Sequence, residues 1–176
     1  MRMYNDKIDA ALRFATIAHG EQKRSYTGED YITHPIAVRG ILKLYSSFCS
    51  PEMEMAALLH DTVEDTQATL YDIETFFGPK VRDLVGWLTD VATLKDGNRA
   101  TRKAMERDKL LKAPKVAKTI KLADLIHNTG SIVSCDPNFA KVYMAEKKLL
   151  LEVLKEGDET LYKRASDQVE QYYVNR

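Results

Sequence analysis

Hydrophobic residues recur at three- and four-residue steps along most of the chain, which is the period of an amphipathic helix. The first such stretch has its apolar residues at Ile8, Ala11, Leu12, Ala15 and Ala18. Further stretches predict helices that begin near residues 35 and 51 and that cover residues 69–77, 80–91, 114–130, 137–155 and 158–174. No segment alternates polar and apolar residues long enough to require a sheet. The pattern therefore predicts an all-α fold: a compact single-domain helical bundle of about eight helices over residues 1–176.

Proline and glycine place several of the expected boundaries. Pro35 fits the first turn of its helix, with His34 just outside that turn, because a proline there gives up no intrahelical hydrogen bond. Gly78 and Pro79 separate two helices, and Gly130 is expected to end the helix that starts near residue 114. Residues 56–66, which follow the start near residue 51, are also expected on one helix.

Composition narrows the class of protein without identifying it. Apolar residues make up 44% of the chain and charged residues 30%, which is typical of a globular domain and not of a disordered one. The 26 basic and 26 acidic residues cancel, so we expect no DNA or RNA partner and no membrane association. The two cysteines form no CxxC pattern, and the first residues lack an apolar signal segment, so a cytoplasmic location is expected. A homo-oligomer stays open.

Residues 56–66 contain the first chemical signal and read Ala-Ala-Leu-Leu-His-Asp-Thr-Val-Glu-Asp-Thr. On one helix, at about 100° per residue, His60, Asp61, Glu64 and Asp65 fall within an arc of about 140°. Three neighbouring carboxylates repel one another, and a bound cation relieves that repulsion. The alternative is a solvated acidic face. The His60-Asp61 pair argues against it, because the pair follows four apolar residues and buried polar groups need partners.

Two other segments could complete a metal site with that pair. Asp124 is flanked by apolar residues, where an ionised carboxylate needs a partner, and a simple ion pair with Lys121 is the alternative. His34 precedes a proline at a helix start, where a structural role is the alternative. Together, His34, His60, Asp61 and Asp124 offer two imidazoles and two carboxylates, a donor set that suits manganese, iron or zinc.

The order His34, His60-Asp61, Asp124 resembles the H…HD…D signature of the HD-domain metal-dependent phosphohydrolases. The surrounding text narrows the resemblance: Tyr-Ile-Thr-His-Pro at 31–35, the whole block at 56–66, and Lys-Leu-Ala-Asp at 121–124. These segments are similar to the hydrolase domain of the RelA/SpoT family and to its stand-alone small alarmone hydrolases, which include the metazoan SpoT homologue. The resemblance covers the chain from about residue 8 to residue 154.

The resemblance implies a reaction and roles for particular residues. The family removes the 3′-pyrophosphate of ppGpp or pppGpp, giving GDP or GTP and pyrophosphate, and Mn²⁺ is its usual metal. By this resemblance His34, His60, Asp61 and Asp124 would be the metal ligands, and Glu64 and Asp65 would activate water and transfer protons. The chain is too short for the synthetase domain of the long bifunctional members, so hydrolysis without synthesis is expected.

The family also implies contacts with a guanosine nucleotide. They map onto Lys23, Arg24, Asn128 and Tyr143, while surface or core roles are the alternatives for Lys23 and Tyr143. A second basic group, which is interleaved with acidic residues and therefore read mainly as a solvated face, could meet distal phosphates; it contains Arg99, Arg102, Lys103 and Arg107.

One departure leaves the substrate open. Many relatives continue with an arginine after the asparagine, whereas residues 129–132 here read Thr-Gly-Ser-Ile. The alternatives are therefore an HD-domain phosphohydrolase that acts on another nucleotide (an adenine alarmone, a dNTP, a nucleoside monophosphate or NADPH) and a non-catalytic nucleotide-binding regulator.

Overall fold

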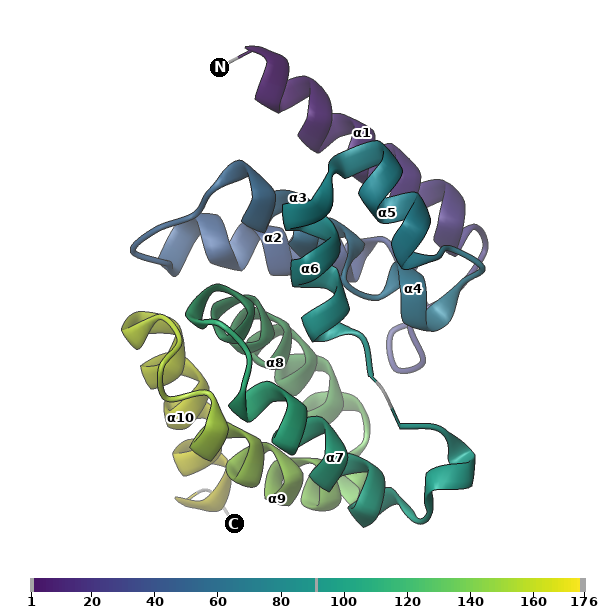
Figure 1. Cartoon of the computed structure of the whole chain (residues 1–176). Coiled ribbons are helices and arrows are strands. Elements are labelled where there is room, and N and C mark those ends of the chain that lie inside the picture. The colour runs from purple at the N-terminus through teal and green to yellow at the C-terminus, as the bar shows by residue number, and fades with distance from the viewer. Residues whose placement is uncertain (1, 91, 175–176) are drawn as a thin grey trace. The chain divides into compact units, whose positions relative to one another are not determined.

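The computed structural model describes residues 2–90 and 92–174, and every named element in these ranges is a helix. The only β-type pairing in them is an isolated bridge between Lys23 and Asp30. The all-α prediction is confirmed. The chain divides into two compact units, residues 1–89 and residues 90–176 (Figure 1). The described ranges hold ten α-helices, two more than expected, because residues 62–65 and 99–111 each form a separate helix.

The first unit is built around α3 (Pro51–Leu59). This helix packs against α1 (Arg2–His19), α2 (Thr33–Tyr45) and α6 (Pro79–Leu88). Its residues 56–59 are fully buried, so contacts surround the helix on every side. The unit is completed by the four-residue α4 (Thr62–Asp65) and by α5 (Leu70–Phe77), which packs on α6.

Local sequence explains where several of these helices begin. Ser50 caps α3 by accepting a hydrogen bond from the backbone N–H of Met53, and Pro51 occupies its first turn. Thr69 and Asp72 form a reciprocal capping box at the start of α5. Gly78 joins α5 to α6 with φ of 90°, a conformation that strains residues with a Cβ. The predicted boundary at Gly78 and Pro79 is therefore confirmed.

The expected single helix through residues 56–66 is interrupted at His60 and Asp61, and this prediction was wrong. Two side chains compete for carbonyl groups of the preceding turn: the imidazole of His60 contacts the carbonyl of Ala57 at 2.9 Å, and the hydroxyl of Thr62 donates to that of Leu59 at 2.7 Å. Asp61 adopts ψ of −8°, away from the helical value. A turn therefore presents His60 and Asp61 at the junction of α3 and α4.

The second unit is built around α8 (Lys115–Cys135), which packs against α9 (Pro137–Val153) and α10 (Glu159–Val174). A 3₁₀ turn, η1 (Leu94–Asp96), precedes α7 (Arg99–Leu111), which packs on α9. Asn98 caps α7, because its side-chain oxygen accepts a hydrogen bond from the backbone N–H of Thr101.

Some helix ends differ from the prediction. Gly130 was expected to end a helix, but α8 continues through it to Cys135, because the following turn buries Ile132 and a single glycine costs a helix only about 1 kcal/mol. Similarly, α2 begins at Thr33, so His34 lies inside its first turn. The helix predicted over residues 80–91 ends earlier, at Leu88, because Thr89 adopts an extended conformation; Val91 lies outside the described residues.

Within residues 2–90 and 92–174, no helix is both long enough and apolar enough to cross a bilayer.

Candidate metal centre and nucleotide cavity

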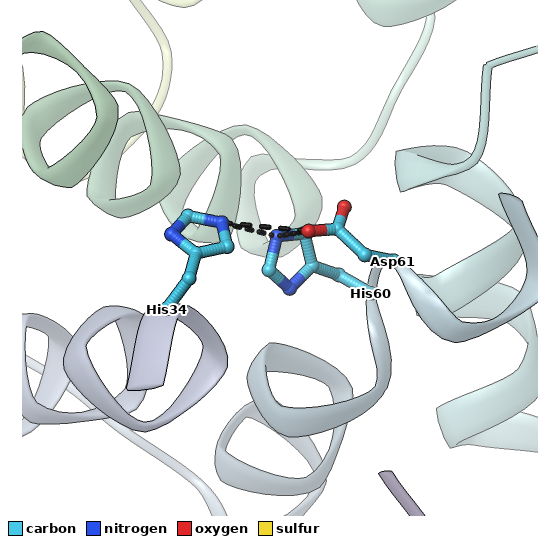
Figure 2. A group of neighbouring side chains, drawn as sticks. All are labelled: His34, His60 and Asp61. Carbon is cyan, nitrogen blue, oxygen red and sulfur yellow. Dashed lines mark hydrogen bonds and ion pairs between the residues drawn. The ribbon is translucent and has the colours of Figure 1, made fainter. Parts of the chain in front are cut away.

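Three of the four expected metal ligands meet in the first unit. Figure 2 shows His34, from α2, and His60 and Asp61, from the turn after α3, with their polar atoms directed at one another. The two Nε2 atoms are 3.2 Å apart, and Asp61 Oδ2 lies 3.4 Å from His34 Nε2 and 3.1 Å from His60 Nε2. Both imidazoles are almost fully buried, at 1% and 2% exposure. Burial fixes the rings and excludes competing water.

A backbone contact orients one of the two imidazoles. His60 Nδ1 lies 2.9 Å from the carbonyl oxygen of Ala57, which can only accept a hydrogen bond. The Nδ1 therefore carries the proton, and in the neutral ring the lone pair is on Nε2, the atom that faces His34 and Asp61. This is the arrangement that a metal-ligating histidine requires.

The distances within this group fit a shared cation. Donor atoms about 2.0–2.2 Å from one ion, at tetrahedral or octahedral angles, lie about 2.8–3.6 Å from one another. The three separations of 3.1, 3.2 and 3.4 Å fall in that range. Lone pairs that converge so closely repel unless a proton or a cation joins them. His34, His60 and Asp61 can therefore hold a divalent metal.

Tyr31 supports this group and was not singled out as a functional residue from the sequence. Its hydroxyl donates to Asp61 Oδ2 at 2.7 Å, and its ring packs edge-on against His34. Burial, followed by the carboxylates of Asp61 and Asp65, raises the pKa of Tyr31 above its ordinary value, so the hydroxyl keeps the proton that it donates. The available signal was its place in the motif at 31–35, three residues before His34.

Glu64 and Asp65, the expected acid–base pair, lie exposed on α4. The carboxylate of Asp65 accepts a hydrogen bond from the Gln22 side chain at 3.2 Å. Gln22 in turn contacts Nδ1 of His19 at 2.8 Å, and the buried His19 ring stacks on Tyr31 with 4.5 Å between ring centroids. Nothing in the sequence pattern pointed to Gln22 or His19, since both contacts depend on the path of the loop between α1 and α2.

That loop also carries the two predicted basic contacts. Lys23 forms an exposed ion pair with Asp30 across the isolated β-bridge. The guanidinium of Arg24 lies 5.6 Å from the centre of the Tyr31 ring, within cation–π range. Arg24 is thus placed next to the residue that holds Asp61, whereas Lys23 is on the surface of the loop.

Asp124, the fourth expected ligand, belongs to the second unit and is buried in α8. Its two carboxylate oxygens accept hydrogen bonds from different side chains. Oδ2 accepts one from Lys121 at 3.0 Å, and Oδ1 accepts one from Asn128 at 2.6 Å. Although burial alone lowers the pKa of Lys121, the carboxylates of Asp124 and Glu106 raise it well above its ordinary value. Lys121 is therefore charged, and it keeps Asp124 ionised.

The second unit contains a cavity of about 150 Å³ beside Asp124. Asn128 and Tyr143, the two substrate-binding residues expected in this unit, line the cavity together with Asp124. Three of the four basic residues expected mainly on a solvated face also line it, at successive turns of α7: Arg99, Lys103 and Arg107. The fourth, Arg102, instead donates to the carbonyl of Gly97 at 2.7 Å. Most of this basic group therefore faces a cavity.

Comparison with protein families shows which family the chain belongs to. The HD-domain family matches residues 11–150, which include all four expected ligands. The chain belongs to the HD-domain family. Membership implies a divalent metal ion, and in this HD-domain protein His34, His60 and Asp61 could bind it.

Individual relatives place this HD-domain protein near the alarmone hydrolases. It is 39% identical over 128 residues to the human guanosine-3′,5′-bis(diphosphate) 3′-pyrophosphohydrolase MESH1, covering 72% of this chain and 70% of that protein. It is also 39% identical over 136 residues to the Escherichia coli bifunctional (p)ppGpp synthase/hydrolase SpoT, covering 75% of this chain but 19% of SpoT.

Solved structures agree with the sequence comparisons. A metazoan orthologue of SpoT, described as hydrolysing ppGpp and acting in starvation responses, superposes with a TM-score of 0.86 and 30% identity over 94% of this chain and 95% of that one. A protein from Listeria monocytogenes gives a TM-score of 0.69 at 25% identity, over 85% of this chain and 99% of that one. The expected resemblance to the MESH1 and SpoT type of HD-domain protein is confirmed.

Proposed function

We propose that this protein is a Mn²⁺-dependent guanosine-3′,5′-bis(diphosphate) 3′-pyrophosphohydrolase. The reaction adds one water to ppGpp or pppGpp and gives GDP or GTP and pyrophosphate. The observation that carries the proposal is the convergence of His34, His60 and Asp61, whose donor atoms lie within 4.8 Å of one another in a chain related to MESH1. Mixed imidazole and carboxylate donors suit manganese, iron and zinc, and the resemblance to the RelA/SpoT hydrolases favours manganese among them.

His34, His60 and Asp61 are the proposed metal ligands, with Asp124 as the fourth. The ionised carboxylate of Asp124 and its place in the HD-family pattern support that role. A divalent ion bound by these residues would polarise a phosphate oxygen and lower the pKa of its bound water. Tyr31 holds Asp61 by the hydrogen bond to Oδ2, and the Ala57 carbonyl holds His60, so the protein fixes both side chains before the substrate arrives.

Glu64 and Asp65 are the proposed acid–base pair. Each follows the HD turn on α4, and an exposed carboxylate there can accept a proton from the attacking water. Gln22 keeps the carboxylate of Asp65 in one orientation through its amide N–H. The leaving 3′ oxygen gains a proton in the same reaction, and the second carboxylic acid can supply it.

The proposed substrate contacts come from residues of both units. Arg24 and Lys23 offer cations for phosphate oxygens, which a guanidinium binds with two parallel hydrogen bonds. Asn128 and Tyr143 offer an amide and a phenol within the cavity of the second unit, groups that suit a base or ribose. A cytoplasmic location belongs to the same proposal, since both cysteines, Cys49 and Cys135, are free thiols. No DNA or RNA partner is proposed for a chain with net charge of +0.

The segment after Asn128 motivates a second candidate. Residues 129–131 read Thr-Gly-Ser, and because none of them is charged, this segment offers no cation to the nucleotide. Thr129 is also buried and bonded within the protein. Hydrolysis of another nucleotide is therefore the second candidate function. A regulator without activity is the weaker alternative, because binding alone requires neither the metal group nor the acidic pair.

Product analysis on a nucleotide panel tests these proposals. The purified protein would be incubated with MnCl₂ and ppGpp, pppGpp, an adenine alarmone, a dNTP, a nucleoside monophosphate and NADPH, with ion-exchange chromatography of the products. We expect GDP and pyrophosphate from ppGpp. Preferential turnover of the adenine alarmone, or of a nucleotide without a 3′-pyrophosphate, would replace the substrate assignment, and tight binding with no product at all would favour a regulator.

A further inference from the structure

The cavity of the second unit carries more positive than negative charge. Its lining includes five basic and three acidic side chains. Each acidic side chain pairs with one of the basic ones: Arg99–Glu146, Lys103–Glu106 and Lys121–Asp124, at 2.6, 2.5 and 3.0 Å. Two cations remain, Lys147 and Arg107, and neither forms an ion pair with a carboxylate in the part of the chain that the structure describes.

Lys147 is the more unusual of these two cations because it is buried. Its side chain extends from α9, and the residue is 1% exposed. The ammonium donates to Thr129 Oγ1 at 2.6 Å and to the side-chain oxygen of Gln168 at 2.7 Å. Both acceptors are neutral. Burial lowers the pKa of Lys147 to about 7, although the nearby charge of Asp124 opposes that effect.

The contacts of Lys147 leave it able to bind an anion. An ammonium has three N–H donors, and two are used within the protein. A structural link between Thr129 and Gln168 needs a hydrogen-bond donor but no charge, since both acceptors are neutral. A buried cation that contacts no carboxylate is costly, and an anion that enters the cavity removes much of that cost.

Arg107 adds a second cation to the same cavity. It lies on α7, which packs on the helix that carries Lys147, and it has no hydrogen-bond or ion-pair partner among the described residues. Arg107 and Lys147 line the same cavity. A guanidinium and an ammonium bind a phosphate group better than a neutral ring or sugar, because their hydrogen bonds to phosphate oxygens are charge-assisted.

We propose that Lys147, together with Arg107, forms a subsite that binds a phosphate group of the nucleotide inside the cavity of the second unit. The inference rests on the proposed function for the identity of the nucleotide, and it adds a specificity determinant to that site. It assigns a chemical role to a lysine that lies outside the HD motifs.

Paired binding measurements test the inference. Isothermal titration calorimetry would compare GDP, guanosine and inorganic pyrophosphate on the Mn²⁺-loaded wild type, Lys147→Met and Lys148→Met. The second variant removes the same charge from the exposed neighbouring position of α9. We expect Lys147→Met to lower the affinity for GDP about tenfold or more, as loss of a charge-assisted hydrogen bond requires. The affinity for guanosine should stay within about twofold of the wild-type value. Lys148→Met should bind all three ligands as the wild type does.

A spectroscopic readout separates phosphate binding from a structural role. NMR titration of the Lys147 side-chain amine, assigned by its loss in Lys147→Met, should show that its pKa rises when GDP or pyrophosphate is added and not when guanosine is added. Equal weakening of GDP and guanosine in Lys147→Met, an unchanged GDP affinity, or a wild type that binds neither GDP nor pyrophosphate would each overturn the inference.

The outcomes distinguish this inference from the proposed function. If the wild type does not hydrolyse ppGpp but binds pyrophosphate and GDP, and Lys147→Met binds them more weakly, the phosphate subsite stands and the substrate assignment fails. If the wild type hydrolyses ppGpp and Lys147→Met binds GDP normally, the subsite fails and the hydrolase remains.

Discussion

The Nε2 atoms of His34 and His60 lie 3.2 Å apart, although 26 residues separate them in the sequence. The packing of α2 against α3 brings the two rings together, and both are buried where water cannot separate them. Two imidazoles and the Asp61 carboxylate at such distances form a group that is stable only with a shared proton or cation. The convergence of His34, His60 and Asp61 is thus a consequence of helix packing within the first unit.

Substitution of a ligand should remove metal and activity together. His60→Ala and Asp61→Ala each delete a donor atom from the group, so we expect metal content near zero and turnover lowered at least about 100-fold. Metal analysis of dialysed protein and a pyrophosphate-release assay measure the two effects. Asp83→Ala, an exposed carboxylate of α6, is the matched control and should change neither. A metal-free Asp61→Ala that still turns over would disprove the assigned role.

Loss of the Tyr31 hydroxyl should weaken metal binding without unfolding the protein. Tyr31→Phe removes the hydrogen bond to Asp61 Oδ2 but keeps the ring contacts with His19 and His34. Partners that orient a ligand typically contribute about 10–100-fold to metal affinity, so a Mn²⁺ titration should show a decrease of that size. Tyr71→Phe, on the exposed face of α5, is the control. Equal Mn²⁺ affinity in wild type and Tyr31→Phe would mean that Asp61 needs no such support.

Glu64→Gln should separate chemistry from metal binding. The amide keeps the shape of the side chain but cannot accept the proton of the attacking water, so kcat should fall about 10²–10⁴-fold with metal content unchanged. Steady-state kinetics with ppGpp, alongside metal analysis, measure both. Glu74→Gln, which changes an exposed pair with Arg82, should retain kcat. Normal kcat in Glu64→Gln would shift the base role to Asp65.

Much of the fold could be predicted from the sequence, because buried positions follow the helical period. The buried Val81, Val85 and Leu88 of α6 follow that period, and α5 starts at its capping box as local rules require. The break at His60 and Asp61 could not be predicted by periodicity, since it arises from side chains that bond to the preceding carbonyls. Gly130 was misread because local glycine rules ignore the burial that carries α8 past it.

The candidate site could be predicted only where a residue type is unusual for its position. His60 and Asp61 stood out because they follow four apolar residues, and His34 because it precedes a proline at a helix start. Three-dimensional contacts then added Tyr31. Lys147 had a signal that was overlooked: it falls on the buried face of α9 with Met144 and Leu151, where the helical period requires an apolar residue.

Burial of Lys147 also predicts a specific pH dependence of stability. The pKa falls from 10.5 in the unfolded chain to about 7 in the folded protein, so the unfolded state binds more protons between these values. Stability should therefore rise from pH 7 towards pH 10, and the cost of the buried charge, at most about 5 kcal/mol, is fully present below pH 7.

Lys147→Met isolates this effect, because methionine carries no charge and fills a similar volume. Urea unfolding of the metal-free proteins in EDTA, between pH 6 and pH 9.5, would give the difference in unfolding free energy between variant and wild type. The stability of the variant relative to the wild type should be highest at pH 6 and should fall steadily as the pH rises. The lost hydrogen bonds to Thr129 and Gln168 add an offset to this difference that does not depend on pH. Lys148→Met, which removes an exposed ammonium, should give a flat difference across the same range. A flat difference for Lys147→Met as well would show that its ammonium is solvated in the folded protein, and the buried, uncompensated cation on which the phosphate subsite depends would not exist.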